Sequence, residues 1–498
     1  MPRRALAKRT ASSLSWKAFE TIGAQAIFLV RLLVLARLLV PEDFGLMAIG
    51  MTAIGVFRAV TEFGLLPALV QRSSLDKEHY DAAWSAGLLR GFAVCALTAL
   101  AAPLIASLFA EPRAIPIIQA LSIVLLVEMV ASIKLADLLR DMEFRPLAIV
   151  GLAQALANTL AAVAAAPSLG VWALVLGTLC GGLTRTALSY VVAPYRPSFR
   201  LSRHHFSQLI HFGRWIMINS WIVVIGGGLL RVIIARKLGV AELGLFFLAS
   251  RLALLPTVVA SQVVGQVAFP LFARIRASHK ETTAAFQGLF SATIIIFVPA
   301  CVLLIISAPY IVEEVLGPRW QGTVPMIQLL ATASLLGLFR EALVPLLKGH
   351  GALGKLTSLE LAQSIAVLPL AWILAHLFGL IGVGYAFLVA TALAQVLGVI
   401  FVEQILEKPF HGTLRLLVAI GATTAAAGAL SMAIMGAVGG LFGLGLALFL
   451  FAGFYLAAVL ALDHWLRFGI VSRLRLVLSP LSSRTPAPAA LPRNAPEE

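Results

Sequence analysis

Four arginines lie inside long apolar stretches of the sequence, where a charged side chain is costly to keep. They are Arg31, Arg58, Arg231 and Arg251. An arginine at the centre of a membrane costs roughly 3 kcal/mol on insertion scales, so such a group normally has a partner or a use. At about 1.5 Å per residue of helix, all four are expected in the middle or outer half of a bilayer. Because headgroups are hard to reach from there, we predict that they face a shared cationic cavity.

Polar neighbours fall on the same predicted helix faces as these arginines. Arg58 and Glu62 are spaced i, i+4 and can form an ion pair. Arg251, Gln262 and Gln266 fall within about 60° of one another on one helix at 100° per residue. The predicted substrate-binding residues are therefore Arg31, Arg58, Arg231, Arg251, Gln262 and Gln266.

A second set of arginines stands nearer the ends of the apolar stretches. From these positions a long side chain can extend along the lipid and place its charge among the headgroups. We expect this role for Arg90, Arg185, Arg214 and Arg340.

Three acidic residues in or near apolar stretches, Glu62, Glu128 and Glu341, leave two interpretations open. They could couple transport to an ion. Glu128 with Lys134, and Glu341 with Arg340, could equally be structural ion pairs.

Three consecutive glycines, Gly226, Gly227 and Gly228, lie in the same stretch as Arg231. Their weak helical propensity would make a hinge easy to form. Small residues also allow two membrane helices to pack closely. The sequence does not separate these interpretations.

Composition restricts the class of protein. The chain has 498 residues, of which 60% are hydrophobic and 12% charged. This indicates a polytopic membrane protein. The net charge of +15 is assigned to basic loops and contact with anionic headgroups rather than to nucleic acid.

Apolar stretches of about 20 residues, the length that crosses a bilayer as helix, predict an all-α protein with fourteen transmembrane helices. They form two parallel six-helix repeats plus two C-terminal helices. The predicted parts are a basic N-terminus (1–17), a first lobe (18–194), a connector (195–210), a second lobe (211–404), the extra pair (405–466) and a disordered tail (467–498).

The repeat is clearest where the first two predicted helices meet. The segment Ala36-Arg37-Leu-Leu-Val-Pro-Glu-Asp-Phe-Gly45-Leu46 is matched 199 positions later by Ala235-Arg236-Lys-Leu-Gly-Val-Ala-Glu-Leu-Gly244-Leu245. An even number of spans per copy makes the repeats parallel. We expect Arg37 and Arg236 to be interfacial anchors or part of a rim.

Loop charges predict the topology. Lys and Arg are concentrated in alternate short loops, which places both termini in the cytoplasm. The outer loops are too short to carry a catalytic domain, and the sequence has no H-E-x-x-H, P-loop, metal-spaced cluster or nucleophile elbow. We therefore expect neither a metal site nor an enzyme.

The segment from Ala36 to Gly45, together with Glu62-Phe-Gly64-Leu and the six-plus-six-plus-two spans, resembles one branch of the MOP superfamily. This branch comprises the Wzx-like polysaccharide flippases, which are related to lipid II flippases and MATE exporters. The resemblance implies an inner-membrane protein of bacteria that moves polyprenyl-diphosphate-linked oligosaccharide between leaflets. It also implies that arginines of helices 1, 2 and 8 line the cavity, where Arg31, Arg58 and Arg251 stand.

On that interpretation the protein has no cofactor, and a proton gradient, a sodium gradient or the membrane potential drives it. Its partners are the bilayer, the lipid-linked substrate and a polysaccharide polymerase. Two alternatives stay open, a MATE-like antiporter of small molecules and a membrane glycosyltransferase or polymerase. The sequence does not specify the glycan.

Overall fold

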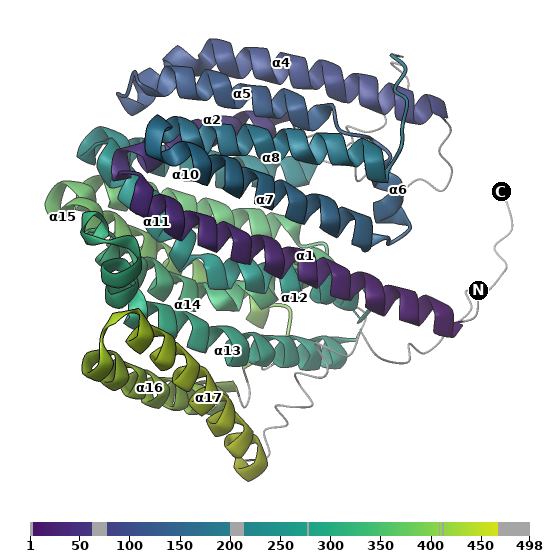
Figure 1. The fold of residues 1–498 in the computed structure, drawn as a ribbon. Helices are drawn as coiled ribbons and strands as arrows, with labels where there is room; N and C mark the ends of the chain where they lie inside the picture. Colours follow the sequence, from purple (N-terminus) through teal and green to yellow (C-terminus); the bar gives the residue numbers. More distant parts are fainter. Residues whose placement is uncertain are drawn as a thin grey trace, which may run out of the picture.

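Figure 1 shows a computed structural model of the protein, which describes residues 3–61, 77–199, 214–275, 278–407, 409–410 and 413–466. Within these ranges the regular structure is helical throughout. Part of the predicted second span (62–69), most of the connector and the tail (467–498) lie outside the described residues.

The helices fall into three sets in chain order. The first group is α1 (Arg3–Leu38), α2 (Pro41–Thr61), α4 (Lys77–Phe109), α5 (Ala114–Met129), α6 (Leu135–Arg140), α7 (Phe144–Leu169) and α8 (Val171–Val192). The second group is α10 (Arg214–Leu238), α11 (Val240–Ala253), α12 (Leu255–Ile275), α13 (His279–Tyr310), η1 (Ile311–Leu316), η2 (Pro318–Trp320), α14 (Thr323–Gly349) and α15 (Leu353–Glu403). The last two helices are α16 (Thr413–Val438) and α17 (Gly440–Leu466).

Length and apolarity qualify nine of the described helices as candidate membrane spans, with α15 counted once, or ten if α11 and α12 form one bent span. The helices lie roughly side by side as a bundle, with α16 and α17 outside α13 (Figure 1). The prediction of an all-helical, multi-pass membrane protein is therefore confirmed.

α15 consists of two helical arms, 353–378 and 380–403, that meet at Gly379. Gly379 has φ 60° and ψ −140°, a conformation that glycine adopts readily and other residues do not. Gln363 of the first arm donates to Thr391 Oγ1 of the second at 3.3 Å, and Lys355 to Gln404 Oε1 at 2.9 Å. These pairings make the two arms antiparallel.

Two predicted helices end differently. The apolar stretch 114–137 is long enough for one membrane helix, but α5 ends at Met129 and α6 begins only at Leu135. Side chains of α8 bind the backbone here: Thr186 donates to Val127 O at 2.8 Å and Tyr190 to Val130 O at 2.6 Å. Because these hydroxyls satisfy carbonyls near the end of α5, the helix can stop there. At the N-terminus, α1 already begins at Arg3 instead of near residue 18.

The tightest approach between the two groups joins the start of α2 to the start of α11. A Cβ atom at Gly45 would collide with the carbonyl oxygen of Val240, and one at Gly244 with the carbonyl oxygen of Pro41. Only glycine allows backbones this close. We call this end of the bundle the junction end.

The arginines of the junction end bind backbone carbonyls of the opposite group. Arg37 donates from Nε to Val315 O at 2.6 Å and from Nη2 to Glu314 O. Arg236 donates to Ser107 O at 3.3 Å, at the end of α4. The indole of Trp320 donates to Ala36 O at 2.7 Å. These contacts hold the two groups together at the junction end.

Candidate functional site

Three of the predicted arginines, Arg31, Arg231 and Arg251, come together between the two groups of helices. Arg31 lies on α1, Arg231 on α10 and Arg251 on α11. The guanidinium carbons of Arg31 and Arg251 lie 5.1 Å and 5.8 Å from the ring centre of the same residue, Phe28. Arg251 is also close enough to both other arginines for charge repulsion to matter. We call these three residues the deep cluster.

The partners of the deep cluster are neutral. Arg31 donates to Asn158 Oδ1 on α7, and Arg231 donates to Thr52 Oγ1 on α2 at 3.2 Å. Arg251 is exposed and stacks on Phe28 and Phe247, but it has neither a hydrogen bond nor an ion pair to any residue in the described part of the chain. Arg251 therefore lies near two cations that have only neutral hydrogen-bond partners, and an anionic ligand would relieve the repulsion.

The helices fix the depth of this cluster. Arg31 stands seven residues before the end of α1 and Arg231 seven before the end of α10, or about 10 Å from the junction end at 1.5 Å per residue. Arg251 stands eleven residues after the start of α11, or about 16 Å away. The cluster is therefore well inside the bundle.

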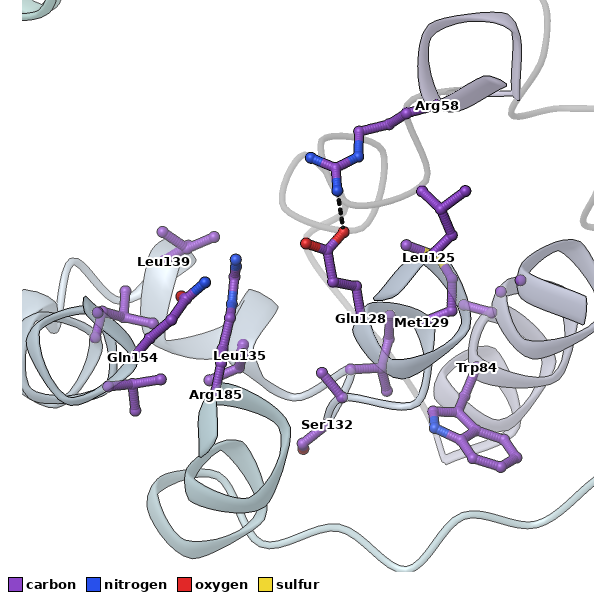
Figure 2. Close-up of a pocket in the computed structure, with 18 of the residues that line it drawn as sticks. Arg58, Trp84, Leu125, Glu128, Met129, Ser132, Leu135, Leu139, Gln154 and Arg185 are labelled. Atoms are coloured by element: carbon purple, nitrogen blue, oxygen red, sulfur yellow. Dashed lines mark hydrogen bonds and ion pairs between the residues drawn. The ribbon is translucent and has the colours of Figure 1, made fainter. Parts of the chain in front are cut away.

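Arg58 does not join the cluster. It lies 17 residues after the start of α2, or about 25 Å from the junction end, which is farther from that end than the three arginines of the deep cluster. Its Nη2 forms an ion pair of 2.6 Å with Glu128 on α5 (Figure 2). This contact places Glu128 with Arg58 instead of Lys134, which lies over the Tyr80 ring. Glu62, the predicted partner, lies outside the described residues.

The Arg58–Glu128 pair lines a cavity of about 510 Å3 within the first group of helices. We call this cavity the first-group pocket. Arg90 and Arg185 line it too, whereas none of its lining residues belongs to the deep cluster. Arg90 and Arg185 thus face this cavity, and whether they also reach the headgroups stays a prediction. The side chain of Arg214 is outside the described part.

The prediction that Gln262 lies on the same helix face as Arg251 is wrong, because the helix is not straight. The chain bends by 45° between α11 and 255–262. Pro256 at the start of α12 has no N–H to continue the helical bonding and disfavours helix in the residue before it. Gln262 is exposed on α12, beyond the bend. The side chain of Gln266 is outside the described residues.

The glycine triplet lies within α10, which continues through it without a break. A Cβ at Gly226 would lie 2.8 Å from Ser364 Oγ of α15, and one at Gly228 would lie 3.3 Å from the methyl group of Thr52. These two glycines therefore allow close packing. Gly227 has no described atom within 4 Å of the position that a Cβ atom would take. Close packing therefore does not explain this glycine, and a hinge at Gly227 stays a prediction.

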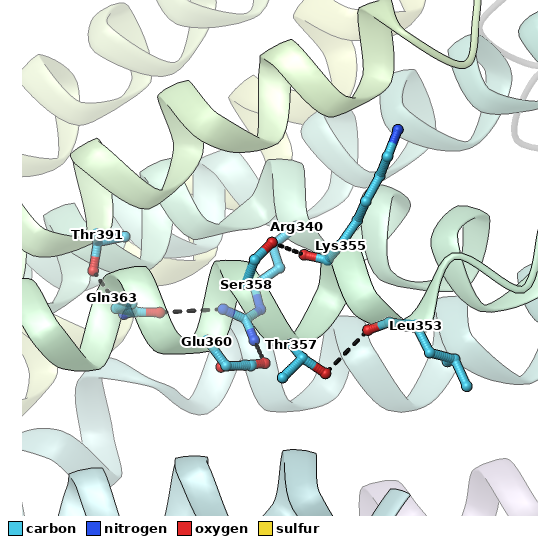
Figure 3. Close-up of polar contacts among 8 residues, drawn as sticks. All are labelled: Arg340, Leu353, Lys355, Thr357, Ser358, Glu360, Gln363 and Thr391. Atoms are coloured by element: carbon cyan, nitrogen blue, oxygen red, sulfur yellow. Dashed lines mark hydrogen bonds and ion pairs between the residues drawn. The ribbon is translucent and has the colours of Figure 1, made fainter. Parts of the chain in front are cut away.

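Arg340 belongs to a polar network in the second group. It pairs with Glu360 and donates to Gln363 Oε1 at 3.1 Å, and Gln363 continues to Thr391 (Figure 3). The network ties α14 to both arms of α15. The counter-ion of Arg340 is therefore Glu360 instead of the predicted Glu341. Because the guanidinium is held in this network, the expectation that it reaches the headgroups is wrong.

Glu341 faces a second cavity of about 510 Å3. Ser261 of α12 is its hydrogen-bond partner, and Arg340, Lys348 and Glu360 are the other charged residues of the lining. We call this cavity the second-group pocket.

Sequence reasoning missed the neutral partners Asn158, Thr52 and Phe28. A signal existed for Asn158, because it interrupts an alanine-rich stretch (155–166) in which polar groups are expensive. Thr52 and Phe28 gave no comparable signal, since threonine and phenylalanine are ordinary residues of apolar helices.

The comparisons with known proteins agree with this architecture. The chain is 25% identical to the lipopolysaccharide biosynthesis protein WzxC of Escherichia coli (strain K12) over 82% of this chain and 83% of that protein. It is also 25% identical to the succinoglycan biosynthesis transport protein ExoT of Rhizobium meliloti (strain 1021), over 69% and 70%.

A solved structure of the lipid II flippase MurJ, in an inward closed conformation, has a TM-score of 0.73 at 14% identity, covering 90% of this chain and 99% of that chain. This similarity shows the fold. The family described as "Polysaccharide biosynthesis protein" matches residues 34–325, more than half of the chain, so the protein belongs to that family.

Proposed function

We propose that this protein is a flippase of the bacterial inner membrane that moves polyprenyl-diphosphate-linked oligosaccharide from the inner to the outer leaflet. It would act by alternating access and without covalent chemistry, in the synthesis of exopolysaccharide, O-antigen or capsule. The observation that carries this proposal is the deep cluster, in which three arginines from both helix groups meet without a bound carboxylate among the described residues.

The chemistry of the cluster suits a diphosphate. The phosphates must cross hydrocarbon, and fixed positive charge lowers the cost of that passage. A guanidinium can contact two phosphate oxygens with its planar fork. Because Arg251 has its donors unused by the described protein groups, it is the arginine most available to the ligand. The polyprenyl chain can stay in lipid meanwhile.

We propose that the chain crosses the membrane fourteen times, as two six-helix lobes plus α16 and α17. The junction end offers support, because matched residues of the repeat play reciprocal parts there: Gly45 with Gly244, and Arg37 with Arg236. With both termini in the cytoplasm, the junction end faces outward. The described conformation would then be closed on the outer side.

For the energy source, we propose an ion gradient, of protons or sodium, or the membrane potential. Glu341 is the favoured coupling residue, because its carboxylate faces a cavity instead of a fixed counter-ion. Glu128 is less suited, since Arg58 already neutralises it. A polysaccharide polymerase would take the flipped product.

Reconstitution tests the function directly. Purified protein in liposomes with a fluorescent, diphosphate-linked polyprenyl saccharide should make the inner-leaflet label accessible to an impermeant quencher faster than empty liposomes do. The lipid should be recovered chemically unchanged. Leaflet exchange at the empty-liposome rate would reject the flippase, and new glycosidic bonds would favour a glycosyltransferase.

A further inference from the structure

The first-group pocket contains none of the three arginines of the deep cluster, and most of its described charged residues are basic. Its described lining includes four basic residues, Lys17, Arg58, Arg90 and Arg185, and two acidic ones, Glu20 and Glu128. Among these described residues, the positive charges outnumber the negative ones by two. Arg58 and Arg185 are both exposed, so an anionic ligand can reach their guanidinium groups.

Both carboxylates of the pocket already have a cation. Glu20 accepts from Lys17 at 2.9 Å, and Glu128 accepts from Arg58 at 2.6 Å. Arg185, by contrast, forms no hydrogen bond or ion pair with the residues that the structure describes. In Figure 2 its side chain points into the cavity next to Gln154 and across from the Arg58–Glu128 pair. The pocket thus offers an unused guanidinium beside an amide.

The pocket and the deep cluster share two helices. Gln154 of the pocket and Asn158, the partner of Arg31, are four residues apart on α7, or about 6 Å along the same face. On α1, Glu20 of the pocket precedes Arg31 by eleven residues, or about 16 Å. An anion leaving the pocket toward the junction end would therefore meet the deep cluster next.

We propose that the first-group pocket is a loading site that binds the diphosphate of the lipid-linked substrate before the deep cluster receives it. This inference rests on the proposed function. A diphosphate diester has two negative charges, which suit a described lining with more cations than carboxylates. Arg185 would hold it through two oxygens, and the Gln154 amide can donate a further hydrogen bond.

Binding stoichiometry tests this assignment without a transport assay. The full-length protein in detergent is dialysed against radiolabelled farnesyl diphosphate, which presents a diphosphate on a short prenyl chain, as a monoester without the sugar. Wild type should bind two molecules per chain. Arg185→Gln and Arg251→Gln should each bind one, and the double variant should bind none.

Two further variants keep the test specific. Arg415→Gln removes an exposed arginine of α16, outside the lining of the first-group pocket, and should still bind two molecules. Arg185→Lys keeps the charge without the planar fork, so it should retain the second site with weaker binding. A comparable loss in Arg415→Gln would overturn the assignment to the pocket.

The outcomes separate the loading site from the flippase. One site in wild type that is lost in Arg251→Gln and kept in Arg185→Gln would overturn the loading site and leave the proposed function intact. A complete absence of binding to wild type would contradict both. Inorganic diphosphate should compete at the Arg185-dependent site. If that site takes inorganic diphosphate but excludes farnesyl diphosphate, it serves a free cytoplasmic anion and the inference is wrong.

Discussion

Arg340 and Arg251 are both arginines on apolar helices, but the protein surrounds them in opposite ways. Arg340 pairs with Glu360 and bonds to Gln363, so its charge is satisfied inside the second helix group. Arg251 rests on two phenylalanine rings, and its donors are unused within the described residues. The position of an arginine in an apolar stretch therefore does not define its function. Its interaction partners define it, so Arg340 and Arg251 should respond differently to the same substitution.

The largest effect is expected at the deep cluster, in transport. Arg31→Gln/Arg251→Gln removes two guanidinium groups, each worth about 1.5–3 kcal/mol as a charge-assisted contact, so flipping should fall by about 100-fold or more. Stability should change little, because neither arginine loses a paired carboxylate. The measurement is leaflet exchange in liposomes beside thermal unfolding in detergent.

Lysine at the same two positions provides the control. It keeps both charges without the planar fork and should restore flipping only in part. Flipping at the wild-type rate by the double Gln variant would show that the deep cluster, like the Arg340 network, is not needed for transport.

The next effect is expected at Arg340, in stability. Arg340→Gln leaves Glu360, which is 8% exposed, as a buried carboxylate without its counter-ion. The free energy of unfolding should fall by about 3–5 kcal/mol. Denaturation in detergent measures it, and Arg340→Gln/Glu360→Gln should recover much of the loss because no buried charge is left. Equal stability of the single and double variants would show that the pair has no such role.

A smaller loss of stability is expected where the two helix groups meet without any charge. Gly244→Ala places a Cβ against the carbonyl oxygen of Pro41, and overpacking of this kind typically costs about 1–3 kcal/mol. Unfolding of the detergent-solubilised protein measures it. Gly265→Ala, at a helical glycine with open space around its Cβ position, is the matched control. Similar stability of both variants would mean that α2 and α11 separate easily.

The smallest effect on stability is expected at Gly227, where alanine meets no described atom. Gly227→Ala should stabilise α10 by about 0.5–1 kcal/mol. If α10 bends at this residue while Arg231 changes its surroundings, flipping should slow although the amount of folded protein is unchanged. The measurement is the rate of leaflet exchange in liposomes with equal protein density. An unchanged rate would mean that the three glycines serve only helix packing.

The sequence by itself determined the class of protein, the positions of many helices and the choice of arginines within apolar stretches. Long apolar stretches with few charges specify membrane helices wherever they occur, because the cost of exposing peptide groups to lipid is local to each segment. The junction glycines, Gly45 and Gly244, were also visible as a repeated pattern. Their contact in the structure gives that pattern a physical reason, since both allow two backbones to touch.

Only the tertiary structure decided which side chains meet. Helical spacing gives the direction of a residue on its own helix, but a partner on another helix depends on packing. Arg58 therefore pairs with Glu128, 70 positions away, and Arg31 with Asn158, 127 positions away. The bend between α11 and α12 also moved Gln262 out of the predicted alignment. For the same reason, Arg185 could be found in the first-group pocket only after α8 had been placed against α7.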